Sequence, residues 1–189
     1  MLTLYQKLTI VLWIAHEVLW GILARGNKKD AIRAKSFPRA LSLLALFLGF
    51  VLIYSPFLSV GILGIQLLPK DEYSGIAGVV ICVSGLLFAW RARGLLGKNW
   101  SGAVTLKIDH ELIREGPYAI VRHPIYTGLL FAMLGSAVAM TELKGLVAVA
   151  LVFWGLLQKI RGEEVLLESH FSEYREYTLR VKKLIPFLY

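Results

Sequence analysis

The fold is decided by one stretch of the chain, residues 124–158, which reads PIYTGLLFAMLGSAVAMTELKGLVAVALVFWGLLQ. It contains two apolar runs, residues 124–140 and 143–158, separated only by Thr141 and Glu142. So short a link requires two consecutive helices to lie side by side and antiparallel. Each run approaches the ~20 apolar residues that a membrane-spanning helix needs. The stretch therefore predicts a tight helical hairpin within a membrane.

Three further apolar runs precede the hairpin, at residues 3–24, 40–58 and 74–96. The chain of 189 residues is 57% hydrophobic and 18% charged, whereas soluble domains average about 25% charged residues. One small globule cannot bury such an apolar excess. We therefore expect an all-α integral membrane protein with about five transmembrane helices. Pro56 should kink or end the second helix, leaving an apolar tail up to Leu68.

The basic residues gather between the apolar runs. Six of the 21 Lys and Arg residues fall in each of the segments 25–39, 91–122 and 159–183, and five spans place all three segments on one side of the membrane. The positive-inside rule makes that side cytoplasmic and the N-terminus external. The net charge of +8 then reflects orientation and contact with anionic membrane lipids, and nucleic acid is not an expected partner.

Several kinds of site are excluded by the sequence. Cys82 is the single Cys, so neither an intrachain disulfide nor a thiolate metal cluster can form. GxGxxG, Walker A, HExxH and CxxC patterns do not occur, which leaves a soluble-type nucleotide fold and a zinc site without support. We expect no metal site.

The polar segments 91–123 and 159–189 should meet on the cytoplasmic side, and they carry most of the His, Tyr and Glu residues. In the first, Arg122 and His123 precede Pro124, which is well suited to the first position of a helix. A helix N-terminus offers free N–H groups to a carboxylate or another anion. The alternative is that Arg122 and His123 are only interfacial anchors.

In the second segment, Lys159 and Glu163 share one helix face with the apolar and aromatic stripe Leu167, Phe171, Tyr174, Thr178 and Val181, which predicts an amphipathic helix. A charge on such a face near a membrane is costly unless it is paired or holds a ligand. Glu163 is therefore a better candidate than Glu164, which lies about a quarter turn away. The alternative is a surface ion pair between Lys159 and Glu163.

His16 and Glu17 lie near the middle of the first apolar run. Ionisable groups inside a span are normally buried in protein or functional. Pairing within the bundle and a functional role both stay open for these two residues.

The polar segments contain a series of motifs in a fixed order, namely Gly97-Lys98-Asn99-Trp100-Ser101, His110-Glu111-Leu112-Ile113, Gly116-Pro117-Tyr118, Arg122-His123-Pro124-Ile125-Tyr126, Glu163-Glu164 and a tail with Phe171, Tyr174, Tyr177 and Pro186. Together they resemble the isoprenylcysteine carboxyl methyltransferases and their prokaryotic relatives, within a larger group that includes phospholipid methyltransferases. The resemblance covers about the C-terminal half. It implies one membrane methyltransferase domain over residues 1–189, with N-terminal helices in 1–68 and a catalytic core in 74–189.

The resemblance also implies S-adenosyl-L-methionine as the methyl donor, held in a cytoplasmic pocket over the hairpin, and a lipidic or prenylated acceptor that enters from the bilayer. The residues that would bind the cofactor are His110, Glu111, Leu112, Ile113, Tyr118, His123, Pro124, Ile125, Tyr126 and Glu163.

Two positions depart from the family pattern. Where relatives commonly have a substrate-holding Arg four residues before the Glu, this chain has Lys159, with Arg161 nearby. A Lys cannot bind a carboxylate bidentately as Arg does, so either residue could hold the substrate. A shortened stretch, His170-Phe171-Ser172-Glu173, stands where relatives often have Phe-Gly followed by two acidic residues.

Methylation of a carboxylate requires no general base, because the nucleophile is already ionised at pH 7. The expected catalytic residues are Arg122, Arg161 and Lys159. Either of the two arginines would orient the acceptor carboxylate. Glu163 would bind the donor's ammonium group. The rings of Trp100, Tyr118 and Tyr126 would surround the cationic sulfonium. The expected substrate-binding residues are Trp100, Arg122, Lys159 and Arg161.

Three alternatives stay open. A phospholipid N-methyltransferase of the phosphatidylethanolamine type would need a base such as His110 or His123. A non-enzymatic membrane scaffold or transporter subunit would bind no methyl donor, and a reductase could share this architecture. The short spans could also pack against a second copy of the chain as a homo-oligomer.

Overall fold

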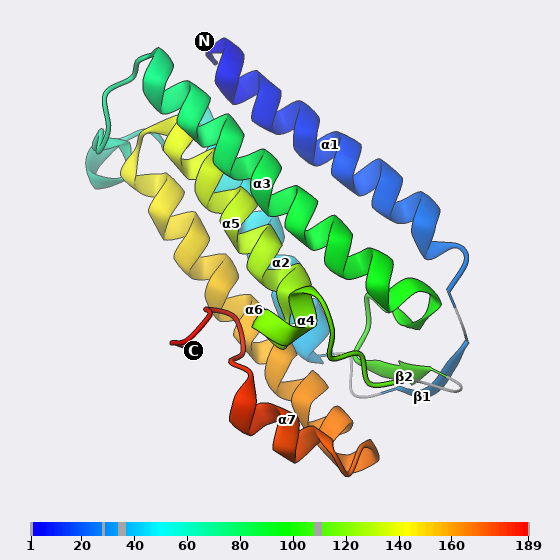
Figure 1. The fold of residues 1–189 in the computed structure, drawn as a ribbon. Coiled ribbons are helices and arrows are strands. Elements are labelled where there is room, and N and C mark those ends of the chain that lie inside the picture. Colours follow the sequence, from blue (N-terminus) through cyan, green and yellow to red (C-terminus); the bar gives the residue numbers. More distant parts are fainter. Residues whose placement is uncertain (1, 28, 34–36, 108–110, 189) are drawn as a thin grey trace.

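Five long helices form the body of the molecule (Figure 1). The computed structural model describes residues 2–27, 29–33, 37–107 and 111–188. The long helices are α1 (Leu4–Ala24), α2 (Phe37–Tyr54), α3 (Glu72–Leu96), α5 (Pro124–Met140) and α6 (Leu143–His170). Within the described residues, α1, α2, α3 and α6 are long and apolar enough to cross a membrane, and α5 is apolar but shorter. The expected all-α membrane fold is confirmed.

The helix boundaries agree with the sequence at most positions. The second helix ends at Tyr54, just before Pro56, and short 3-10 helices, η1 (Pro56–Leu58) and η2 (Gly61–Gly64), follow it. The predicted hairpin is present, and Thr141 makes its turn in the left-handed region at φ 63°.

The C-terminal region differs from the sequence prediction. The helix that begins the second polar segment ends at His170, and the chain turns before a separate short helix, α7 (Tyr174–Arg180). The prediction of a single amphipathic helix that continues to Val181 is therefore wrong. Phe171 takes an extended backbone conformation (φ −108°, ψ 112°) that ends α6. This turn allows Tyr174 and Tyr177 to be buried.

Helices α3 and α5 pack with almost no side chains between them. A Cβ atom placed on Gly85 would lie 2.4 Å from the backbone nitrogen of Ala132, and one on Gly135 would lie 2.3 Å from that of Cys82. Small residues at such crossings let helix backbones approach closely. This packing fixes the end of α3 relative to the start of α5, which are the two walls of the site described below.

All the polar elements lie at the end of the bundle opposite to the N-terminus (Figure 1). They are α4 (Pro117–Ile120), α7 and a two-stranded antiparallel ribbon of β1 (Asp30–Arg33) and β2 (Thr105–Lys107). The expectation that the two polar segments meet is confirmed, although the ribbon was not predicted. The cytoplasmic location of this end stays a prediction.

The two ionisable residues near the middle of α1, His16 and Glu17, lie in different environments. His16 is buried, and its Nδ1 accepts a hydrogen bond from Nε1 of Trp90 at 3.0 Å. Its ring lies 4.7 Å from that of Trp20. Glu17 is exposed, at a shallow groove between α1 and α2. The pairing expected for such residues within the bundle is therefore observed for His16.

Candidate active site

A pocket lies at the polar end of the bundle and holds about 840 Å³ of empty space, including its open mouth. One wall is the chain that leaves α3, from Leu96 to Thr105. The opposite wall is the start of α5 with Glu163 of α6, and Tyr174 and Tyr177 of α7 close the pocket.

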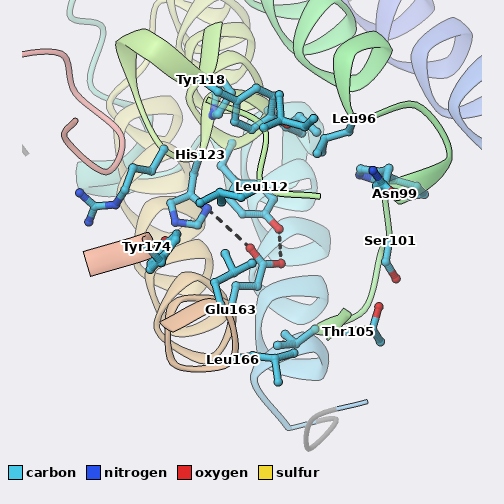
Figure 2. Close-up of a pocket in the computed structure, with 18 of the residues that line it drawn as sticks. Leu96, Asn99, Ser101, Thr105, Leu112, Tyr118, His123, Glu163, Leu166 and Tyr174 are labelled. Atoms are coloured by element: carbon cyan, nitrogen blue, oxygen red, sulfur yellow. Dashed lines mark hydrogen bonds and ion pairs between the residues drawn. The ribbon is translucent and has the colours of Figure 1, made fainter. Parts of the chain in front are cut away.

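Glu163 and Glu111 are the carboxylate residues that line this pocket, and Figure 2 shows Glu163 beside His123. The hydroxyl of Tyr126 donates a hydrogen bond to Oε1 of Glu163 at 2.6 Å. Nδ1 of His123 lies 3.6 Å from Oε2, and Nζ of Lys159 lies 3.8 Å from Oε1. The expectation that Lys159 and Glu163 share one helix face is therefore confirmed.

Lys159 lies behind Glu163 and is largely buried. Its ammonium group donates to the backbone oxygen of Gly102 at 3.0 Å and lies 5.1 Å from the centre of the Tyr126 ring. The lysine thus joins both walls of the pocket. With the Glu163 carboxylate at 3.8 Å, the ammonium group therefore has one hydrogen-bond acceptor, one ring face and one anion around it.

Tyr118 and Tyr177 support the pocket from α4 and α7. Burial, followed by the charge of Glu163, raises the pKa of Tyr118 above its ordinary value. Burial raises the pKa of Tyr177 to about 12. Both phenols are therefore neutral at pH 7, and the hydroxyl of Tyr177 donates to the backbone oxygen of Tyr118 at 2.6 Å.

Arg122 and Glu164 form a second cluster beside the pocket. Nε and Nη2 of Arg122 donate to Oε1 of Glu164 at 3.0 and 2.7 Å. Nη1 donates to the backbone oxygens of Thr178 and Val181. Nε2 of His123 lies 3.3 Å from the same carboxylate, and Nζ of Lys183 lies 3.0 Å from it.

Glu164 lies beyond the apolar part of α6, among these cationic partners. Burial favours its neutral form, but the hydrogen bonds from His123, Arg122 and Lys183 outweigh burial and lower its pKa to about 2. From the sequence, Glu164 is a weaker functional candidate than Glu163. The structure gives Glu164 a connecting position between α6, the start of α5 and the C-terminal tail.

The C-terminal tail is attached to the site through its backbone carbonyl groups. The amides of Arg122 and His123 donate to the backbone oxygens of Lys182 and Lys183 at 2.7 and 3.0 Å. The hydroxyl of Thr127 donates to the backbone oxygen of Leu184 at 2.7 Å. Residues far apart in sequence therefore hold His123 at the pocket.

Most of the residues expected from sequence line the pocket, namely Trp100, Glu111, Leu112, Ile113, Tyr118, Arg122, His123, Pro124, Ile125, Tyr126 and Glu163. Lys159 contacts Glu163, as described above. Arg161 is exposed, and its Nη1 donates to the side chain of Gln158 at 3.2 Å, so it is not brought to the pocket. His110 lies outside the described residues. The roles of all these side chains stay predictions.

Several pocket residues were not singled out by the sequence, and two of them carry unpaired polar atoms. Oδ1 of Asn99 and Oγ1 of Thr105 are buried and have no hydrogen-bond partner within the part of the chain that the structure describes. Asn99 belongs to a motif in which only Trp100 was singled out, whereas Thr105 carries no pattern that points to a site. Figure 2 shows both residues across the pocket from Glu163. No cluster of three or more metal-ligating side chains occurs among the described residues.

The resemblance inferred from the motifs is confirmed by comparison with known proteins. Residues 78–169 match the model of the isoprenylcysteine carboxyl methyltransferase family. A probable protein-S-isoprenylcysteine O-methyltransferase of Oryza sativa subsp. indica is 31% identical over 115 residues, which are 59% of this chain and 60% of the relative. The protein-S-isoprenylcysteine O-methyltransferase of Homo sapiens is 30% identical over 125 residues, 64% of this chain and 44% of the relative.

A relative with a different name also matches. The cobalt-zinc-cadmium resistance protein CzcN of Cupriavidus metallidurans is 33% identical over 114 residues, 59% of this chain and 47% of the relative. The matches thus span 60% or less of the length of these relatives. The region matched by the family model contains both main walls of the pocket.

Proposed function

We propose that this chain, which matches the isoprenylcysteine carboxyl methyltransferase family over residues 78–169, is a membrane carboxyl O-methyltransferase. It uses S-adenosyl-L-methionine and forms a methyl ester on the carboxylate of an isoprenylcysteine-like lipidic acceptor. The observation that carries the proposal is the pocket at the polar end of an apolar bundle, where Glu163 lies among aromatic rings.

The side chains of the pocket fit the methyl donor. Glu163 offers a negative charge to its ammonium group. The rings of Trp100, Tyr118 and Tyr126 line the same space and can face a cationic sulfonium. Asn99 and Thr105 bring buried oxygens that lack protein partners among the described residues, and such groups are expected to meet a polar ligand.

The methyl donor, when bound, supplies an electrophilic methyl group on a positively charged sulfur. The acceptor carboxylate needs no base, because it is ionised at pH 7. Of Lys159 and Arg161, Lys159 is the better placed to hold that carboxylate, since its ammonium group lies 3.8 Å from Glu163, which lines the pocket, and Arg161 is exposed. The walls would align the reactants and exclude water, an effect worth ~7 kcal/mol or more in good geometry.

The location of the reaction follows from the bundle. The apolar surfaces of α1, α2, α3 and α6 fit an integral membrane protein, and the acceptor chain would reside in the bilayer beside them. We propose that the polar end faces the cytoplasm, because 18 of the 21 Lys and Arg residues lie in the segments expected there. Within this scheme residues 74–189 are the catalytic core, and residues 1–68 supply the N-terminal helices.

Calorimetric titration of the detergent-purified protein with S-adenosyl-L-methionine tests the donor site. The wild type should bind, and E163A and H123A should lose binding. E168Q is the matched control, because Glu168 is an exposed carboxylate on the same helix, and it should bind as the wild type does. Absence of binding by folded wild-type protein would instead favour a scaffold or a reductase.

A further inference from the structure

Arg93 is a buried cation that the proposed chemistry does not use. It lies in the last turn of α3 and is 4% exposed. Its Nη1 donates to the backbone oxygen of Gly97 at 2.5 Å, in the turn where Gly97 takes a positive φ of 51°. Its Nη2 donates to Oδ1 of Asn27 at 2.9 Å and to the backbone oxygen of Leu23 at 3.4 Å.

The same guanidinium faces the pocket wall. Its central carbon lies 4.6 Å from the centre of the Trp100 ring and 5.9 Å from that of Trp20. The two rings themselves meet edge to face, with centroids 5.5 Å apart. Trp100 lines the pocket. Arg93 therefore contacts the end of α1, the turn after α3 and the back of one pocket wall.

We propose that Arg93 is a positioning residue, which holds Trp100 and the turn at Gly97 in place so that this wall of the pocket keeps its shape. The planar guanidinium can donate to several carbonyl groups while stacking on a ring, whereas the point charge of a lysine cannot do both. The effect of Arg93 on donor binding rests on the proposed function. The effect of Arg93 on the position of Trp100 is independent of the proposed function.

The chain offers variants that separate this role from a simple anchor for α1. N27A removes the hydrogen bond to the Asn27 side chain, which follows the end of α1, and leaves the contacts with Leu23, Gly97 and Trp100 in place. Arg91 is the matched control, because it lies on the same helix two residues earlier and is exposed.

The test is fluorine NMR of the detergent-purified protein labelled with 5-fluorotryptophan, in which W100F assigns the Trp100 resonance. R93Q should move the Trp100 resonance and leave that of Trp154, on the exposed surface of α6, unchanged. R93K should move it by an intermediate amount, and R91Q and N27A should leave it in place. If R93Q does not fold, the Trp100 resonance of R93K decides the test, because a lysine cannot make all the contacts of Arg93 with Gly97, Asn27 and Trp100.

An unmoved Trp100 resonance in R93Q or R93K would overturn the proposal, as would an equal shift in N27A, which would assign the effect to the hydrogen bond with Asn27 after α1. Titration with S-adenosyl-L-methionine provides the second readout. R93Q should weaken binding about fivefold, the scale of one buried cation–aromatic contact, whereas R91Q should not. Failure of the wild type to bind the donor would contradict the proposed function and leave the fluorine result to decide the role of Arg93.

Discussion

Arg122 donates two hydrogen bonds to a single oxygen of Glu164, at 3.0 and 2.7 Å, although 42 residues separate them in the chain. The pair joins the start of α5 to α6, and Arg122 also binds backbone oxygens of the C-terminal region. All three guanidinium nitrogens are thus engaged within the protein. The pair therefore connects the elements that hold His123 at the pocket.

The charge on Glu164 predicts a stability that depends on pH. Because its pKa is lowered from an ordinary 4.5 to about 2, its carboxylate favours the folded state above about pH 4.5. That contribution should be lost as the pH falls from 4.5 toward 2. Melting temperatures of the wild type and E164Q in detergent should differ at pH 7 and converge across this interval. A constant difference would contradict the assignment.

The variant R122A should abolish ester formation. Arg122 either orients the acceptor carboxylate directly or holds the tail and His123 in place, and both roles are needed for turnover. The measurement is methyl transfer by protein that still unfolds cooperatively, with donor binding followed in parallel. Unchanged turnover with intact donor binding would contradict both roles.

The variant K159A should raise the KM for the acceptor by at least about tenfold, the scale of one charged contact with a buried carboxylate. R161A should leave the KM near the wild-type value, because Arg161 is exposed and points away from the pocket. K159R should restore acceptor binding, since a guanidinium can hold a carboxylate bidentately. A larger rise in the KM for the acceptor in R161A than in K159A would assign the substrate contact to Arg161.

Gly85 tests the packing that sets the two walls of the pocket. A Cβ at this position would meet backbone atoms of α5 at 2.4 and 2.5 Å, so G85A should destabilise the protein by ~1–3 kcal/mol. G94A is the matched control on the same helix, because nothing lies within 4 Å of its added Cβ. Thermal unfolding should show a clear loss for G85A and little change for G94A. Equal effects would mean that α3 and α5 do not pack as described.

The bundle could be predicted from the sequence because apolar length and the two-residue link at Thr141 and Glu142 leave few arrangements open. Glu163 could be predicted for a similar reason, since helix periodicity places it on the face of Lys159. The turn after His170 could not, because the stripe of apolar residues continues across it with helical spacing. The connecting position of Glu164 depends on Lys183 and the tail carbonyls, which only the three-dimensional fold brings together.

Ester formation is measured by incubating the membrane-reconstituted protein with methyl-labelled S-adenosyl-L-methionine and an S-farnesylated cysteine that carries a free carboxylate. Label should enter the lipid fraction and be released as volatile methanol by mild base, because a methyl ester is hydrolysed under these conditions. E163Q should lose this activity, and E168Q should retain it. Label that enters an aminophospholipid and resists base would identify an N-methyltransferase and contradict the proposed carboxyl methylation. Failure to transfer any label by protein that binds the donor would contradict it as well.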